Sequence, residues 1–192
     1  MELWEAITSR RSCRSFKPSP VREAQINRLI SACQWAPSPL HLQPWEFVII
    51  TETDTKAKIR QVAEDARQAV MAADGPAWVA KYDLTFVEKA PLLICVLYNP
   101  AKSGLGSYFS QQGGAMMAAS AGVQNMLLTA AEMALGSLWL TFFDPGRMKE
   151  VLNIPEKLDI AGLIVLGNPT EWPSAPPRKS PKVFHESYGG AE

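Results

Sequence analysis

The chain has 192 residues, of which 47% are hydrophobic and 20% are charged, the composition of an ordinary globular protein with one core. Its 19 basic and 19 acidic residues cancel, so the net charge favours neither nucleic acid nor an anionic membrane as a partner. Three cysteines at unrelated spacings exclude a disulfide framework and a paired-cysteine metal site, and they fit a reducing cytoplasm. The acidic N-terminus is not a secretory signal, and no stretch is apolar enough to predict a membrane span.

The first half of the chain is predicted to alternate helices with one strand. Hydrophobic spacing predicts helices over residues 3–9, 21–35 and 55–73 and a buried strand over residues 47–51. Three prolines within residues 36–44 exclude both a helix and a central strand, so this stretch is a loop. Residues 78–86 are rich in aromatic side chains and ambiguous, and a short helix is one interpretation of them.

The second half adds three more strands and ends in an arm. The predicted strands cover residues 92–97, 138–142 and 161–166, and the predicted helices cover residues 110–135 and 147–152. Gly136 is well placed to cap the longer helix. Five prolines from Pro169 to Pro181 predict an extended arm outside the core. Four strands separated by helices predict an α/β (α+β) fold, a single domain over residues 1–192 with its arm at residues 169–192.

The long helix carries a stripe of small residues. Gly114, Ala118, Ala121, Gly122 and Asn125 recur at three- and four-residue steps, and such a stripe lets two helices approach closely. One interpretation is a helix buried within its own monomer. The other is a helix at the centre of a dimer.

Few side chains suggest catalysis without a cofactor. The two histidines, His41 and His185, are far apart in the chain, and the motifs of a hydrolase triad, a zinc protease or a phosphate-binding P-loop are missing. We therefore assign no catalytic side chain and no metal site, and expect a bound cofactor to supply the chemistry.

The segment from Arg10 to Arg14 is the first candidate site. Three arginines and Ser12 within five residues suit a phosphate group, because a guanidinium donates two hydrogen bonds to a phosphate. The alternative is that these arginines only complement the dipole at the C-terminus of the preceding helix.

Two further candidates lie in proline-rich stretches. Ser38, His41 and Gln43 stand between prolines before a buried strand, a common place for ligand contacts, although a simple helix-to-strand connection is also possible. Arg178 lies on the arm and is either a ligand contact or a solvated charge.

Together these motifs resemble the nitroreductase family of FMN enzymes over nearly the whole chain. The resemblance rests on R-R-S-x-R after an N-terminal helix, A-P-S-x-x-x-x-Q-P-W, a long Ala/Gly helix, L-G-S-L-W-L, L-G-N-P and an arginine in a proline-rich tail. It implies a nitroreductase-like fold with a central mixed sheet of four to five strands, and a homodimer with the long helix at its interface and two FMN sites there.

The resemblance also implies roles for individual residues. Arg10, Ser12 and Arg178 would hold the phosphate, Arg11 would contribute mainly its backbone, and Arg14 would stabilise the reduced flavin. The other implied cofactor contacts are Pro37, Ser38, Pro39 and Leu40 from the partner chain, together with His41, Gln43, Trp139, Leu140 and Thr141. Candidates for the acceptor pocket are Trp78, Tyr82, Tyr108 and Phe109, although aromatic residues at such positions are as often part of a core.

The implied reaction passes hydride from NAD(P)H through FMN to a nitroaromatic, a quinone or an activated alkene. The chain departs from the family at His41, where an asparagine is usual, and at residues 141–143, where many members have glycines. Dehalogenation and flavin fragmentation remain alternatives, although the short lid at residues 74–86 has no obvious Glu-Tyr-Lys set. A further alternative is a non-enzymatic protein that binds or senses flavin. The neutral net charge and the lack of a known nucleic-acid-recognition motif argue against nucleic-acid binding.

Overall fold

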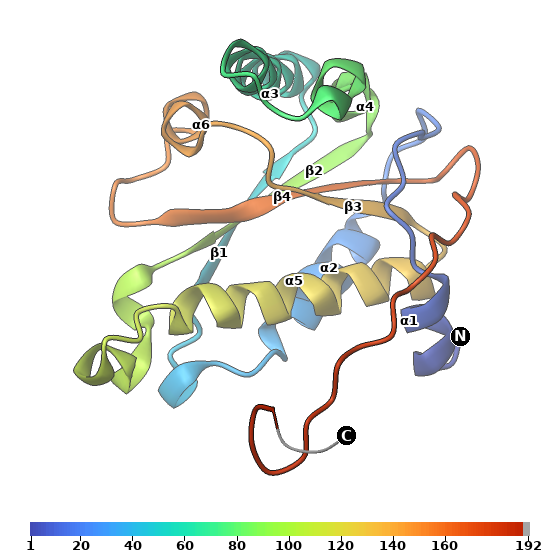
Figure 1. Cartoon of the computed structure of the whole chain (residues 1–192). Helices are drawn as coiled ribbons and strands as arrows, with labels where there is room; N and C mark the ends of the chain where they lie inside the picture. The colour runs from blue at the N-terminus through green and yellow to red at the C-terminus, as the bar shows by residue number, and fades with distance from the viewer. Residues whose placement is uncertain (190–192) are drawn as a thin grey trace.

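The computed structural model describes residues 1–189 and forms three layers, with a sheet between two groups of helices (Figure 1). Helices α1, α2 and α5 cover one face, and α3, α4 and α6 cover the other. The helices are α1 (Leu3–Ser9), α2 (Glu23–Gln34), α3 (Thr53–Ala72), α4 (Thr85–Lys89), α5 (Gly114–Glu132) and α6 (Pro145–Leu152). The strands are β1 (Trp45–Ile50), β2 (Leu92–Tyr98), β3 (Gly136–Leu140) and β4 (Asp159–Gly167).

The sheet has the strand order β1-β2-β4-β3, and its ladders are antiparallel. The resemblance implies a mixed sheet. Within residues 1–189 the four strands pair antiparallel, and the parallel pairing is a single bridge between Ser12 and Ser137 at the outer side of β3. Strands β2 and β3 run in the same direction but are separated by β4. The connection between them, which contains α5, therefore crosses over one face of the sheet. The α/β (α+β) class with helices around one sheet is confirmed.

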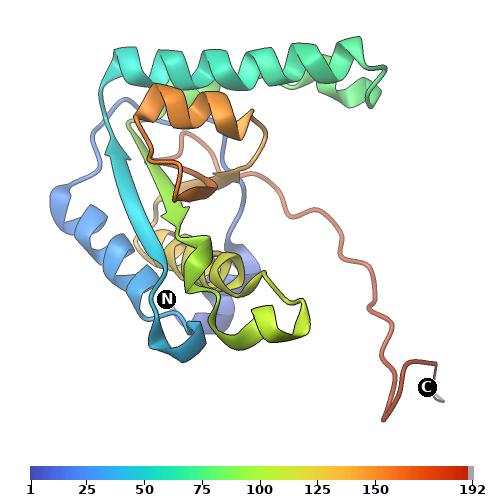
Figure 2. The ribbon, with the colours of Figure 1, turned by 90° about the vertical axis from the view of Figure 1, so that its left-hand side faces the viewer.

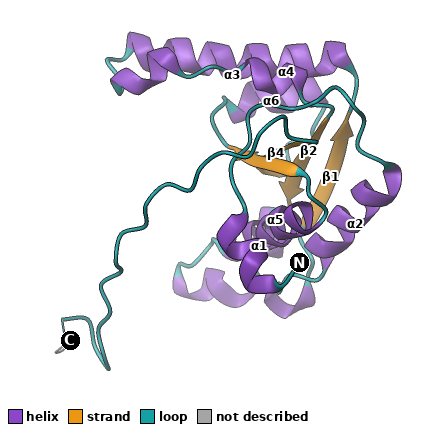
Figure 3. Cartoon of the chain, turned by 90° about the vertical axis from the view of Figure 1, so that its right-hand side faces the viewer, coloured by secondary structure: helices purple, strands orange, loops and turns teal. Residues whose placement is uncertain are grey.

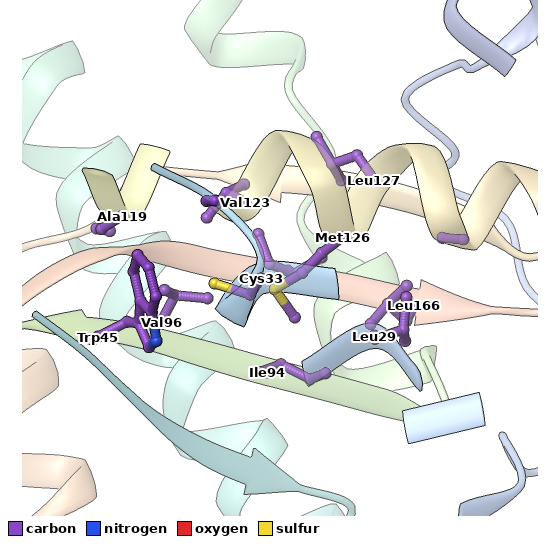
Figure 4. Packing of buried hydrophobic residues seen from close by; sticks show 14 of the residues in the cluster. Leu29, Cys33, Trp45, Ile94, Val96, Ala119, Val123, Met126, Leu127 and Leu166 are labelled. Atoms are coloured by element: carbon purple, nitrogen blue, oxygen red, sulfur yellow. The ribbon is translucent and has the colours of Figure 1, made fainter. Parts of the chain in front are cut away.

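Both faces of the sheet are buried. Alternate residues of a strand point to opposite faces, and in β2 this places Ile94 and Val96 towards α5 but Leu93 and Cys95 towards α3. Figure 4 shows the α5 side, where Leu29 and Cys33 of α2 lie among residues of α5 and of the sheet. Cys33 and Cys95 are fully buried as predicted, and burial raises the pKa of each thiol to about 12.

Two members of the small-residue stripe of α5, Gly122 and Asn125, contact α2 of the same chain. A Cβ atom on Gly122 would lie 2.3 Å from Sγ of Cys33, and Asn125 donates a hydrogen bond to the Ala32 carbonyl at 3.1 Å. The first of the two interpretations of this stripe is therefore correct at these positions. A different face of α5 is open, with Met117 72% exposed and Gln124 exposed.

The end of α5 differs from the prediction. The helix stops at Glu132 because Ala134 adopts a left-handed conformation (φ 55°), and Leu135 N–H returns to the Ala130 carbonyl at 2.8 Å. Gly136 starts β3 instead of capping the helix. A Cβ atom there would meet Cys13 at 3.0 Å and Cβ of Pro169 at 3.1 Å, so a small residue is required for packing.

The arm begins on the body and then leaves it. Thr170 N–H bonds to the Ser15 carbonyl at 3.2 Å, and Phe16 forms a bridge with Pro169. Beyond this point the arm is extended and projects away from the layers (Figures 2 and 3). Across residues 1–189, no helix combines the length and the apolar character that crossing a membrane requires.

Candidate functional site

The Arg10–Arg14 segment is attached to the edge of the sheet through its backbone. Helix α1 ends at Ser9, and the Cys13 N–H then donates to the Ser137 carbonyl of β3 at 3.0 Å. The side chain of Cys13 is buried beside Gly136, whereas Arg14 is exposed and Ser12 is half-buried. The polar members of the segment therefore stay at the surface on a backbone that β3 holds in place.

These residues and the arm together enclose a cavity of about 390 Å³. Its lining consists of Arg10, Arg11, Ser12, Arg14, Pro173, Ser174, Pro176 and Arg178. The structure thus brings Arg178 to the segment from which it is separated by most of the sequence. Sequence reasoning missed the contribution of Ser174, because nothing near it indicates how the arm turns.

The cavity carries positive charge without a counter-ion. No acidic residue lines it, and none of its four arginines forms an ion pair within residues 1–189. Burial lowers the pKa of Arg10, and the charges of Arg11 and Arg178 lower it further. An anion would relieve this repulsion, so the cavity suits a phosphate group.

Arg11 caps the C-terminal end of α1 with its side chain. Its Nη1 donates to the Thr8 carbonyl at 2.8 Å and to the Arg10 carbonyl at 2.7 Å. These bonds satisfy carbonyl groups at the end of α1, as the helix-dipole alternative predicts for this residue. A direct phosphate contact is thus better suited to Arg10 and Arg178 than to Arg11.

Arg14 connects the cavity with an aromatic cluster formed by Trp78, Tyr82 and Phe142. Its guanidinium carbon lies 5.5 Å from the centre of the Tyr82 ring, and its Nε donates to the Tyr82 hydroxyl at 3.4 Å. Trp78 packs edge-on to Tyr82 at 5.7 Å and lies 6.3 Å from Phe142. The sequence indicated Trp78 and Tyr82, whereas Phe142 as a partner of both follows only from the turn after β3.

The Pro37–Gln43 loop lies elsewhere in the monomer. Together with Gly114 and Met117, near the start of α5, Pro37, Ser38 and Pro39 line a shallow, mostly apolar hollow. Leu40, His41 and Gln43 of the same loop have left-handed backbone conformations with φ between 44° and 57°.

Side-chain contacts hold this loop together. The Ser38 hydroxyl accepts a hydrogen bond from the Gln43 N–H at 3.1 Å. The Gln43 amide lies 2.8 Å from Nε2 of His41. These contacts give the loop a defined conformation.

The predicted site residues consequently form two groups at opposite ends of α5. Tyr108 and Phe109 are exposed and belong with the Pro37–Gln43 loop, because their 3₁₀ helix (Gly104–Phe109) precedes α5. The arginine cavity lies at the other end, where Arg11 shares a hollow with Ala131 and Ala134. The 19 residues of α5 span about 28 Å, which is too far for the two groups to contact one ligand within a monomer.

The residues at the end of β3 have different orientations. The Leu140 side chain is buried in the core, and Thr141 is exposed. The Trp139 indole donates to the Ala161 carbonyl at 3.1 Å, at a β-bulge where Ala161 has no partner in β2. Gly162 (φ 151°) makes room for this indole, because a Cβ atom there would lie 2.2 Å from its nitrogen. Leu140 therefore has only its backbone available for a ligand.

Several known proteins resemble this chain in sequence and in fold. The chain is 27% identical to an NADH dehydrogenase of Thermus thermophilus, a match that covers 86% of each chain. It is 28% identical to the 5,6-dimethylbenzimidazole synthase of Rhodobacter capsulatus, over 87% of this chain and 83% of the relative. The structure of oxidised iodotyrosine deiodinase bound to FMN and 3-iodo-L-tyrosine is similar in fold, with a TM-score of 0.85 and 21% identity over 97% of this chain and 100% of that one. The model of the nitroreductase family matches residues 7–168, and the chain therefore belongs to this family.

Proposed function

We propose that this chain binds FMN between two copies of itself and transfers reducing equivalents from NAD(P)H to a small acceptor, such as a nitroaromatic, a quinone or an activated alkene. The observation that carries the proposal is the cavity of unpaired arginines at the edge of β3. A structure of the same fold binds FMN, and FMN has one phosphate that needs such a cavity.

The arginines would hold the phosphate and select against neutral ligands. Arg10 comes from the end of α1 and Arg178 from the arm, and Ser12 adds a hydroxyl donor. Charge-assisted bonds from guanidinium groups are among the strongest hydrogen bonds in proteins. Because Arg178 lies on the arm, binding would also fix the arm against the body.

A second copy of the chain would complete the site. If the exposed faces of two α5 helices pack antiparallel, the Pro37–Gln43 loop of one chain meets the arginine cavity of the other. This pairing would also cover exposed apolar side chains, including Leu3, Trp4, Trp35 and Met117. The separation of the two groups of site residues in the monomer supports this arrangement.

The chemistry that FMN supplies when bound is the acceptance of hydride from a reduced nicotinamide and its transfer onward. Arg14 is positioned to stabilise negative charge next to the aromatic cluster, because its guanidinium is exposed and not committed to a carboxylate. The exposed face of Trp78 offers a flat surface on which an aromatic acceptor stacks. No side chain has to act as a nucleophile.

The proposal is tested by the visible spectrum of the purified protein and by anaerobic addition of NADH and then NADPH. We expect flavin absorbance that either donor bleaches. A colourless protein that also fails to take up FMN would contradict the proposal. Bound flavin that neither donor bleaches would instead indicate a flavin-binding protein without this activity.

The similarity to an iodotyrosine deiodinase favours a second candidate, reductive dehalogenation of a phenol, on the same site. A third candidate, flavin fragmentation, is favoured by the similarity to the dimethylbenzimidazole synthase. Turnover measured with a nitroaromatic, a quinone and a halophenol, together with product analysis of the flavin, separates the three.

A further inference from the structure

The segment of residues 76–82 carries Trp78 and Tyr82 and has few attachments to the protein. It leaves α3 through Asp74, which has a left-handed φ of 53°, and forms a 3₁₀ helix (Ala77–Lys81) before α4. Val79 is buried, but Trp78 is 59% exposed. Within the described part of the chain, the side-chain hydrogen bonds that tie this segment to the rest come from Arg14 to Tyr82 and from Arg67 to Ala80.

Arg67 makes the better defined of these two bonds. Its Nη1 donates to the Ala80 carbonyl at 2.9 Å, and its Nε lies 3.0 Å from both carboxylate oxygens of Glu64. The side chains of Arg67 and Glu64 are only 17% and 24% exposed. Glu64 accepts a further bond from Gln68 at 3.2 Å, so the guanidinium is oriented from within α3 before it reaches the segment.

We propose that Arg67 is a positioning residue for the electron acceptor: through the Ala80 carbonyl it holds the 76–82 segment so that Trp78 and Tyr82 form an aromatic wall beside Arg14. This inference rests on the proposed function. It adds that the position of the wall is set from α3, on the face of the sheet opposite α5, and that planar aromatic acceptors depend on the wall.

The aromatic wall determines which acceptors are affected. Trp78, Tyr82 and Phe142 lie within 6.3 Å of one another by ring centres, and a planar acceptor gains stacking energy only if this cluster stays assembled. Ferricyanide takes electrons without stacking on a wall. Loss of the Arg67 bond should therefore raise KM for an aromatic acceptor and leave turnover with ferricyanide unchanged.

The experiment compares Arg67→Met with Arg60→Met, a matched control on the same helix. Arg60 also forms an ion pair, with Glu88 of α4 at 2.9 Å, but does not reach Ala80. We expect Arg67→Met to raise KM for a nitroaromatic about tenfold at similar kcat, with partial rescue in Arg67→Lys. Trp78→Ala, a change at an exposed side chain, should reproduce the effect on KM.

A measurement on the protein without donor or acceptor tests the positioning directly. Hydrogen exchange of the peptide spanning residues 76–84, which contains the Val79 and Tyr82 N–H groups, should accelerate in Arg67→Met but not in Arg60→Met. Unchanged exchange and unchanged KM in Arg67→Met would overturn the inference. A wild-type protein that reduces neither ferricyanide nor a nitroaromatic would instead contradict the proposed function. The two failures are distinguishable, because the inference alone fails when the wild type is active and Arg67→Met matches it in KM and in hydrogen exchange.

Discussion

The arginine cavity and the aromatic cluster meet at Arg14 but are built in opposite ways. The cavity takes four of its lining residues from the five-residue segment Arg10–Arg14, whose backbone bonds to β3 and whose Cys13 is buried against the sheet. The aromatic cluster takes its members from two separate stretches, and the 76–82 segment is held by one buried side chain and two side-chain hydrogen bonds.

The difference indicates that the arginine cavity and the aromatic cluster have different roles. A segment attached through its backbone keeps its geometry when individual side chains change, which suits a phosphate site that must stay constant. A segment held by side-chain contacts changes position with a single substitution. Within this family, we therefore expect the cofactor site to be rigid and the acceptor preference to be adjustable.

The largest effect is expected from Arg10→Ala or Arg178→Ala. Each should weaken FMN binding on the order of a hundredfold, the equivalent of losing about 3 kcal/mol of charge-assisted hydrogen bonding. Hydrogen exchange of residues 76–84 should stay as in the wild type. Fluorescence titration with FMN measures the affinity, and Arg28→Ala, which breaks a surface ion pair with Glu132 outside the cavity, is the control. Full FMN affinity in both cavity variants would remove the basis of the phosphate assignment.

A smaller effect is expected from Gly136→Ala, which tests whether the attachment to β3 matters. The new methyl group would press on Cys13 and Pro169, which hold the arginine segment and the start of the arm, so we expect a loss of about 1–2 kcal/mol in unfolding free energy. FMN affinity should fall with it. Chemical denaturation and FMN titration measure the two effects, with Gly146→Ala, whose Cβ would meet only the Asp144 carboxylate at 3.3 Å, as the comparison. A variant with wild-type stability and affinity would mean that the segment is held less tightly than the structure indicates.

The smallest effect is a pH dependence of the unfolding free energy through Glu64, the residue that orients Arg67. Hydrogen bonds from Arg67 hold the pKa of Glu64 below its usual value of 4.5. The contribution of the Glu64–Arg67 pair to the unfolding free energy is fully present above pH 4.5, where Glu64 is charged in both the folded and the unfolded chain. This contribution is lost as pH falls through the lowered pKa of the folded state. We expect less than about 1 kcal/mol between wild type and Glu64→Gln above that pH, shrinking towards zero in acid. Unfolding free energies from pH 3 to pH 7 measure this difference. Asp65 and Asp83 also have lowered pKa values and contribute to the pH dependence of stability in the same range. Both residues are present in wild type and in Glu64→Gln, so their contributions cancel in the difference between the two proteins. A difference that grows on acidification would contradict this account of Glu64.

Much of the fold could be predicted from the sequence because its signals are local. Proline and glycine positions, hydrophobic spacing and the alternation of strands with helices located the strands and most helices within a few residues. The arginine segment was equally visible, because its members are neighbours in the chain. The prediction was less accurate for residues 78–86, which form a 3₁₀ helix and the separate helix α4, since aromatic side chains have no single periodic preference.

Contacts between distant segments were not predictable in the same way. The stripe of small residues on α5 fits a helix partner, but spacing alone does not say whether that partner is α2 or a second chain. The structure places Gly122 against Cys33. The antiparallel pairing of β4 between β2 and β3, and Phe142 beside Trp78, likewise depend on how the elements pack.

Residue type and order along the chain were sufficient to predict an α/β fold, a cluster of arginines suited to a phosphate group and a proline-rich arm, because each depends on side-chain chemistry over a few positions. Packing in three dimensions was required to bring Arg178 to Arg10, to place Arg14 on Tyr82, and to separate the arginine cavity from the Pro37–Gln43 loop by the length of α5. Those relations join residues far apart in sequence, and their free energy comes from burial and hydrogen bonding that exist only once the layers have assembled.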